Sequence, residues 1–162
     1  MLNFLPHRRS PYGKEAGASL VEFVLVLPLL LTLLFGMIDF GKAFNYWIDE
    51  THLANEGARW AVVDKNPGGG TLQDYIQQQA DTPELRQGGT SSVPSPLVVC
   101  ISFPTNVSSG TAGEVGDPVH VTASATYNWL PFLGLDVTET TITGSSTMRL
   151  EAVPTTYSAG CS

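Results

Sequence analysis

The feature that most constrains this chain is an apolar run near its N-terminus. Residues 18–38 are 21 in number, and Glu22 is the only charged one among them. A helix needs about 20 apolar residues to span a bilayer, whereas the apolar core of a secretory signal is only about 7–15 residues long. The run therefore predicts a transmembrane helix. We expect Pro28 to kink this helix rather than end it, because lipid gives the backbone few alternative hydrogen-bond partners.

Charge predicts the orientation of this helix and the surroundings of the rest of the chain. The residues before the run carry three Lys/Arg and one histidine against a single acid, Glu15, so the positive-inside rule keeps this end in the cytoplasm. After position 17 there are five Lys/Arg and fourteen Asp/Glu, a net charge of −9. This charge argues against binding of nucleic acid and against a polybasic membrane patch, and it suits a soluble surface outside the membrane.

The two cysteines, Cys100 and Cys161, both fall in the part that we expect to be exported. An even number of cysteines in an oxidising compartment favours one disulfide, and the alternative is two reduced, buried thiols. Cys161 stands in a C-terminal tail, residues 154–162, that has few other residues to hold it. A bridge would pin this tail to the strand predicted around Cys100.

The helical pattern continues beyond the apolar run. Residues of an amphipathic stripe recur every three or four positions: Phe40, Ala43, Phe44, Trp47, Thr51, Ala54, Ala58, Ala61 and Val62. The predicted polar face opposite holds Lys42, Asp49, Glu50, Glu56 and Arg59. The pattern stops at the turn-forming residues 65–70. We therefore expect one helix from about residue 18 to about residue 63, about 70 Å long, with no flexible linker inside it.

Shorter elements follow the long helix. Thr71 and Asp74 form a plausible capping box for a second helix over residues 72–80, and a Gly/Ser/Pro-rich connection follows at residues 83–96. The apolar period then changes to two, which is typical of half-buried antiparallel strands. An apolar corner is expected at residues 129–134. Three strands are expected: residues 97–103, 119–127 and 137–150.

The buried faces of these strands need a cover, and the outer half of the long helix supplies one. The expected fold class is α+β, with a long N-terminal helix packed on a small antiparallel sheet. The chain divides into four segments: a polar leader at residues 1–17, the transmembrane half of the helix at 18–38, its amphipathic half at 39–64, and a globular head at 65–162.

The junction between the leader and the apolar run carries the most specific motif. A basic leader ends in Gly17, Glu22 stands five residues beyond it, and Phe23 follows. This pattern resembles the type IV prepilin processing site, in which a membrane peptidase cuts after the glycine. The Glu–aromatic pair is most similar to the tight-adherence, or Flp, branch, whose major pilin has Glu-Tyr here. The alternative is a chance glycine and glutamate beside a transmembrane helix.

The remainder of the chain indicates which group of pilins it resembles. A head of about one hundred residues is an ordinary small-domain size, unlike the very short Flp major pilin. The chain resembles the TadE-like minor pilins, or pseudopilins, over residues 17–63 and again at 146–151. The resemblance implies a pilin-like fold, cleavage after Gly17 that leaves Ala18 first, and a cytoplasmic-membrane location with the head outside. It also implies three partners: a prepilin peptidase, other pilins and the pilus assembly platform.

The resemblance gives Glu22 and Phe23 a role in subunit assembly. Cleavage would leave a free α-ammonium on Ala18, and a buried charge is tolerated only when it is paired. The Glu22 carboxylate of one subunit and the Ala18 ammonium of its neighbour can neutralise each other. Such a pair also fixes the axial register of two otherwise featureless apolar helices. N-methylation is not implied, because many pilins begin with phenylalanine after the cut and this chain would begin with Ala18.

Nothing in the sequence indicates catalysis, a cofactor or a metal site. His52 lies on the helix, His120 lies on the polar face of a strand, and no His/Cys/Asp/Glu set has metal-ligand spacing. No nucleophile stands beside a base in a recognisable motif. We therefore expect a structural, non-enzymatic subunit. The closest alternative is a single-pass, membrane-anchored exported binding or sensor domain that never assembles into a pilus.

Overall fold

The structure is a computed structural model, and it describes residues 12–104, 113–129 and 139–162. The chain divides into two compact units, Met1–Ile38 and Asp39–Ser162, which are described separately below. Residues 1–11 of the predicted leader lie outside the described residues. The predicted apolar corner also lies outside them, apart from Trp129.

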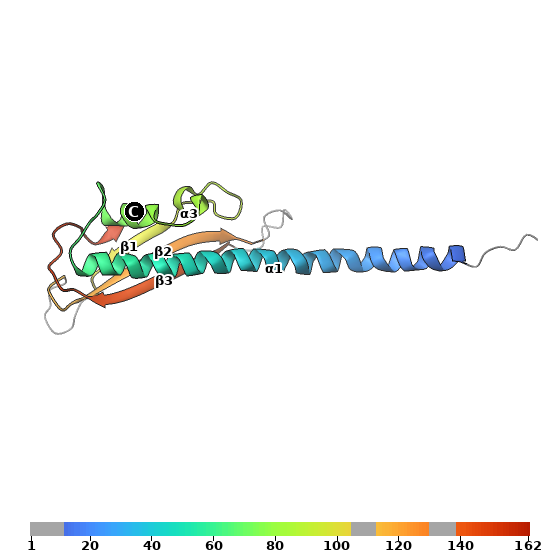
Figure 1. The fold of residues 1–162 in the computed structure, drawn as a ribbon, viewed down its shortest axis with the longest axis horizontal. Coiled ribbons are helices and arrows are strands. Elements are labelled where there is room, and N and C mark those ends of the chain that lie inside the picture. Colours follow the sequence, from blue (N-terminus) through green and yellow to red (C-terminus); the bar gives the residue numbers. More distant parts are fainter. Residues whose placement is uncertain (1–11, 105–112, 130–138) are drawn as a thin grey trace, which may run out of the picture. The chain divides into compact units, whose positions relative to one another are not determined.

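Helix α1 runs from Tyr12 to Val62, so it begins before the predicted start and ends close to the predicted end (Figure 1). It continues through Pro28, and the Thr32 hydroxyl donates a hydrogen bond to the Pro28 carbonyl at 2.8 Å. In the first unit most of the large apolar side chains of α1 are exposed, from 37% at Leu31 to 74% at Leu25. Among the described helices, α1 alone is long and apolar enough to cross a membrane.

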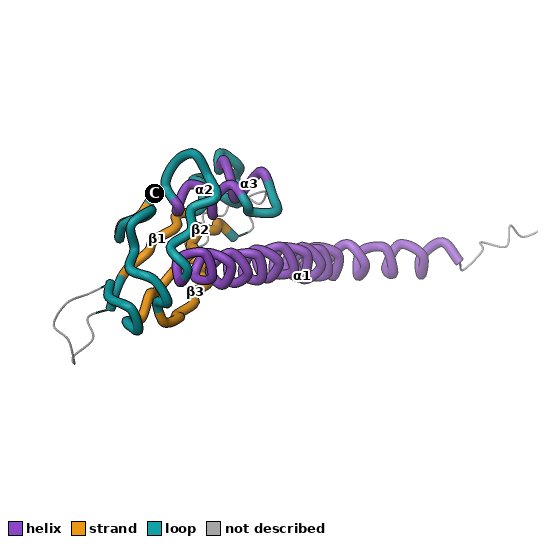
Figure 2. The backbone as a smooth tube through the Cα atoms, turned by 60° about the vertical axis from the view of Figure 1, so that its left-hand side comes forward, coloured by secondary structure: helices purple, strands orange, loops and turns teal. Residues whose placement is uncertain are grey.

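The second unit contains a four-stranded antiparallel sheet, in the order β3-β2-β1-β4. Figure 2 shows its three longer strands, β1, β2 and β3, beside α1. The three predicted strands are present, and a fourth, two-residue strand was not predicted. The long helix and antiparallel sheet confirm the predicted α+β class. The strands are β1 (Val98–Ser102), β2 (Pro118–Asn128), β3 (Glu139–Arg149) and β4 (Gly160–Cys161).

Two short helices precede the sheet. The helix α2 (Leu72–Gln78) starts with the predicted capping box, in which Thr71 and Asp74 each satisfy the other's backbone N–H. The helix α3 (Pro83–Gln87) lies where a connection was predicted, so that expectation was wrong. Its signals are a Thr82 N-cap followed by a proline at the first helical position.

The core of the head lies between one face of the sheet and the helices α1 and α2. Along β2 every second side chain is buried, from Val119 to Tyr127. The same face of β1 contributes Val99 and Ile101. A Cβ added at Gly57 of α1 would meet Ile76 of α2 and Val121 of β2, which shows how closely the three elements pack. Burial of these apolar side chains is the main stabilising contribution to the head.

The face of α1 that enters this core differs from the predicted stripe. Its alanines Ala43, Ala54, Ala58, Ala61 and the neighbouring Val62 are buried as expected. However, Phe40, Phe44 and Trp47 are 63, 49 and 47% exposed, and Glu50 of the predicted polar face is 0% exposed. The helix approaches the sheet with its small residues, because only they permit close contact, and this rotates the large aromatic side chains outward.

The C-terminal tail is also held more firmly than we expected. Asp64, just after α1, accepts hydrogen bonds from the backbone N–H groups of Thr155 and Thr156 at 2.8 and 2.9 Å. The Tyr157 ring is buried and its hydroxyl donates to the Ala61 carbonyl at 2.8 Å. The Gln73 amide donates to the Ser158 carbonyl at 2.9 Å. The tail is therefore fixed at three points before Cys161 is reached.

Candidate functional site

The peptide bond between Gly17 and Ala18, the predicted cleavage point, lies inside α1. Both residues are exposed, and a Cβ added at Gly17 would meet no atom within 4 Å. A glycine inside a helix costs about 1 kcal/mol relative to alanine. Packing within the chain gives no reason for this cost.

Glu22 lies on α1 four residues beyond Ala18, with its side chain exposed. Residues four apart share a helix face and are separated by about 6 Å along the axis. Within the part of the chain that the structure describes, the one Lys/Arg–carboxylate salt bridge is Lys42–Glu84, so Glu22 has no cationic side chain as its partner there. A carboxylate in a membrane-length segment requires a counter-charge. A new α-amino group at Ala18 would be a counter-charge on the same face.

Phe23, the second half of the predicted assembly pair, is 62% exposed on α1. Phe23 is part of an exposed apolar surface that extends along α1 to Met37 and Ile38, which are 71% and 61% exposed. Soluble monomers rarely expose contiguous apolar surface of this extent. The first unit therefore requires lipid or other apolar helices around it.

Cys100 and Cys161 are register partners on β1 and β4, and their sulfur atoms are joined as a disulfide. The bond links residues 61 apart in the sequence. It ties the shortest strand of the sheet to its neighbour, at the end of the tail that Asp64 and Tyr157 also hold.

The head also contains buried acids that the sequence did not reveal. The Asp39 carboxylate accepts a hydrogen bond of 2.6 Å from the Tyr127 hydroxyl, and burial together with this acid raises the pKa of Tyr127. Burial, reinforced by the adjacent charge of Asp49, raises the pKa of Glu50 to about 8. The raised pKa favours the uncharged form of this fully buried carboxyl group near neutral pH.

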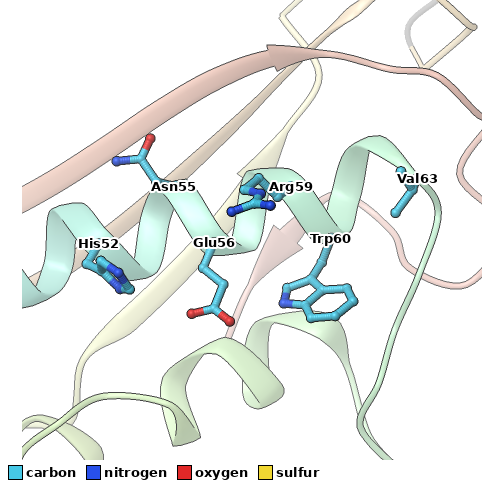
Figure 3. A pocket seen from close by; sticks show the side chains of 6 residues that line it. All are labelled: His52, Asn55, Glu56, Arg59, Trp60 and Val63. Carbon is cyan, nitrogen blue, oxygen red and sulfur yellow. The ribbon is translucent and has the colours of Figure 1, made fainter.

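The exposed flank of α1 forms an open groove of about 570 Å³, shown in Figure 3. Its labelled side chains are His52, Asn55, Glu56, Arg59, Trp60 and Val63. They come from α1 and, for Val63, from the residue directly after it, and no serine, threonine or cysteine among them could act as a nucleophile. Among the described residues no group of three or more His, Cys, Asp or Glu side chains could hold a metal ion. The groove has no catalytic arrangement.

Comparison with known families addresses the N-terminal helix. Residues 17–59 match the family model described as TadE-like protein. Over these residues the chain is similar to TadE-like proteins. The match to TadE-like proteins begins at Gly17 and includes Ala18, Glu22 and Phe23. No curated protein and no solved structure matches the chain.

The TadE-like family is a non-catalytic family of pilus components, associated with pilus assembly and with the tight-adherence pilus machinery. Its match covers α1 almost to the end and stops before α2. The four-stranded sheet of the head therefore lies outside the TadE-like region. The candidate site residues and the residues that match the family model therefore both lie on α1.

Proposed function

We propose that this TadE-like chain is a structural minor pilin, or pseudopilin, that takes part in the assembly of a tight-adherence (Flp-type) pilus. One observation carries the proposal: the family match starts at Gly17, and Glu22 and Phe23 follow on a membrane-length helix. A glycine that packing does not require and a carboxylate without a cationic side-chain partner are both accounted for by a prepilin that is cut and then assembled.

The proposed topology places the leader, residues 1–17, in the cytoplasm and residues 18–38 across the cytoplasmic membrane. The head then lies outside, or at the cell surface once the subunit is in a pilus. The basic leader supports this orientation. So does the disulfide between Cys100 and Cys161, because such bonds persist in oxidising compartments.

In this proposal a prepilin peptidase cuts between Gly17 and Ala18. The bond is helical in the uncut chain, so a peptidase that needs an extended substrate must first unwind the turn around it. Glycine lowers the cost of that unwinding, because it is the weakest helix former apart from proline. This provides a physical reason for glycine beyond its small size.

Assembly then uses the ammonium group that cleavage creates on Ala18 together with the carboxylate of Glu22. The Ala18 ammonium of one subunit neutralises the Glu22 carboxylate of a neighbour, between packed apolar helices. Ala18, Ser19 and Gly36 are small, and a Cβ at Gly36 would meet no atom within 4 Å of its own chain. Small residues let neighbouring helices approach closely. The partners are thus other pilins, the assembly platform and the membrane.

The experiment replaces Glu22 by leucine in the native background. Removing one member of a fully buried ion pair costs about 3–5 kcal/mol. The Glu22→Leu chain should insert in the membrane and be cut after Gly17, but it should lose co-purification with pilus components. The matched control is Thr32→Leu, which removes a polar side chain from the same helix whose hydroxyl is already satisfied by Pro28. That variant should assemble normally.

Normal co-purification and piliation of Glu22→Leu would contradict the assembly role. This result would favour the alternative of a membrane anchor, for which the carboxylate is only an insertion cost of up to a few kcal/mol. Membrane fraction and N-terminal processing are measured in the same cells, so that loss of assembly is not confused with loss of insertion.

A further inference from the structure

The head has an aromatic surface formed by the exposed side chains of Phe40, Phe44 and Trp47 of α1 and by the partly buried Trp129, which directly follows β2. The ring centroids of Phe40 and Phe44 are 6.5 Å apart, and those of Phe44 and Trp47 are 5.6 Å apart. Phe40 also stacks on Trp129, with centroids 6.4 Å apart. The four rings therefore form one continuous surface, although Trp129 is 89 positions beyond Phe40 in the sequence.

This aromatic surface meets the aromatic residues of the core only at Trp129, which packs edge-on against the buried Tyr127 with ring centroids 5.1 Å apart. Tyr46 and Tyr127 are buried, and their hydroxyls donate to the carboxylates of Glu84 and Asp39. Phe40, Phe44 and Trp47 instead leave between 47 and 63% of their surface exposed. A folded head has no reason of its own to keep three large aromatic side chains in water on one helix flank.

The position of the surface in the chain indicates what covers it. Phe40 stands two residues after the last residue of the apolar run 18–38, whose length of about 30 Å matches the hydrocarbon thickness of a bilayer. The polar interface occupies roughly the next 5–7 Å on each side of that hydrocarbon. Helical side chains lean toward the N-terminus, which moves the rings of Phe40 and Phe44 back into this layer.

The composition of the surface fits the same layer. Aromatic rings are enriched at membrane–water interfaces, where one edge meets the acyl chains and a polar atom meets water. The Trp129 indole N–H is already satisfied, since it donates to the Thr140 hydroxyl at 3.0 Å. The ring can therefore be immersed without leaving a donor unpaired.

We propose that this aromatic surface seats the head on the outer leaflet of the membrane, with the rings of Phe40, Phe44 and Trp129 in the lipid interface and Trp47 at its outer edge. The proposal rests on the proposed membrane-spanning topology. It adds that the head itself contacts lipid. Trp129 is decisive, because it directly follows β2 and would reach lipid only if the head rests on the membrane. The head would then be held on the membrane until assembly removes it from the bilayer.

The test uses the full chain in phosphatidylcholine vesicles, with variants that keep one tryptophan and replace the other two by phenylalanine. Nitroxide lipids carry the quencher either at the headgroup or near the top of the acyl chain. Trp129 should be quenched by both lipids and Trp47 mainly by the headgroup probe. Trp60 should be quenched by neither, because it lies 13 residues beyond Trp47, about 20 Å further along α1. Adding a minority of phosphatidylglycerol should not change this order, since the surface is aromatic rather than basic.

A second pair of variants tests the surface itself. Replacing Phe40 and Phe44 together by glutamine should weaken quenching of Trp129 at least about twofold, because the apolar area that holds the head at the interface is lost. The matched control is Val63→Gln, which changes an apolar residue directly after the same helix with 47% exposure. That variant should leave the quenching unchanged.

Quenching of Trp129 and Trp47 no greater than that of Trp60 would overturn the proposal. So would shielding of both rings from aqueous acrylamide without lipid quenching, because another protein chain would then be the occupant. If a single-tryptophan variant fails to fold, labelling of the unaltered chain by a photoactivatable phosphatidylcholine gives the same answer: label is expected on Phe40, Phe44 and Trp129, and its absence there contradicts the proposal. Failure of the chain to insert, measured by alkaline extraction, would instead overturn the membrane-spanning topology and this inference with it.

Discussion

Gly144 of β3 lies directly against the backbone of α1 at Glu50. A Cβ built at Gly144 would overlap the carbonyl group of Glu50 and the amide nitrogen of Thr51. The neighbouring inward-facing residues of β3 are Ile142 and Ser146. The position between them has no side chain, and it is there that the helix comes closest to the strand. This contact fixes how near the long helix comes to the sheet, and it brings the Glu50 side chain into the core.

Replacing Gly144 by alanine should therefore destabilise the head strongly. The added methyl group must displace backbone rather than a flexible side chain, which places the cost at about 3 kcal/mol or more. Thermal unfolding of the full chain in detergent, followed by tryptophan fluorescence, should show a fall in Tm of roughly 10 °C or more. The control is Gly69→Ala, where a Cβ would meet nothing within 4 Å. Equal melting of the two variants would show that the close contact does not exist.

Glu50 predicts a dependence of stability on pH. Burial raises the pKa of Glu50 in the folded head to about 8, above the ordinary value of 4.5. Between these two values the unfolded chain releases its proton and the folded chain keeps it, so stability falls as the pH rises. Glu50→Gln should raise the free energy of unfolding by a few kcal/mol near pH 8 and leave it almost unchanged near pH 4.

The control for Glu50 is Glu56→Gln, on the outer flank of the same helix, which should have little effect at either pH. The measurement is the urea dependence of unfolding at both values. If the difference in unfolding free energy between wild type and Glu50→Gln is the same near pH 8 as near pH 4, the raised pKa of Glu50 is refuted.

Asp64 predicts the opposite dependence. Burial alone would raise its pKa, but the hydrogen bonds from Thr155 and Thr156 outweigh this and lower the pKa to about 2. The stabilisation is therefore present above the ordinary value of 3.8 and is lost as the pH falls toward 2. Asp64→Asn should lower the free energy of unfolding by about 1 kcal/mol near neutral pH, because the amide nitrogen cannot accept a hydrogen bond from a threonine hydroxyl.

Asparagine also suits the positive φ of 49° at position 64, so this variant adds no backbone strain. The difference between wild type and Asp64→Asn should disappear near pH 2. The exposed acid Glu151 provides a control, since Glu151→Gln should not reproduce the pattern. A constant difference at all pH values would mean that the carboxylate charge is not what holds the tail.

The disulfide predicts a measurable number of thiols. Unreduced, purified protein should contain no free thiol, and reduction should expose two, from Cys100 and Cys161. Closing a loop of 61 residues stabilises the folded head by about 4 kcal/mol on a chain-entropy estimate. Because Asp64 and Tyr157 also hold the tail, we expect the reduced head to stay folded but to melt earlier. Two free thiols in the unreduced protein would rule out the bond.

Sequence patterns predicted the elements with strong periodicity and missed those that depend on contacts. The alternation of Val119, Val121 and Ala123 predicted β2, because one face of this strand is buried and the other is partly exposed. A two-residue strand such as β4 has no period, and it exists only because the tail pairs with β1. The buried stripe of α1 was predicted only in part: Ala54 and Ala58 are buried as predicted, whereas Phe40 and Phe44, which hydropathy ranks as core residues, are exposed.

The candidate site shows the same division. Gly17, Glu22 and Phe23 could be selected from the sequence because their meaning depends on spacing along one helix. The burial of Glu50 could not be predicted in this way, since it follows from Gly144, a residue of a strand 94 positions away. Tyr46, Glu50, Leu53 and Gly57 recur every three or four residues and so share one face of α1. Hydropathy alone does not select a buried face that contains a carboxyl group.

The central claim is that Gly17 marks a processing site on an assembling pilin. Its most direct test is N-terminal sequencing of the mature protein, purified from membranes of cells that contain a prepilin peptidase. The sequence should begin at Ala18, with Ala-Ser-Leu-Val-Glu as the first five residues, and a chain in which Gly17 is replaced by a bulky residue should keep its leader. A mature protein that begins at Met1, or at any residue beyond Ile38, would contradict the account.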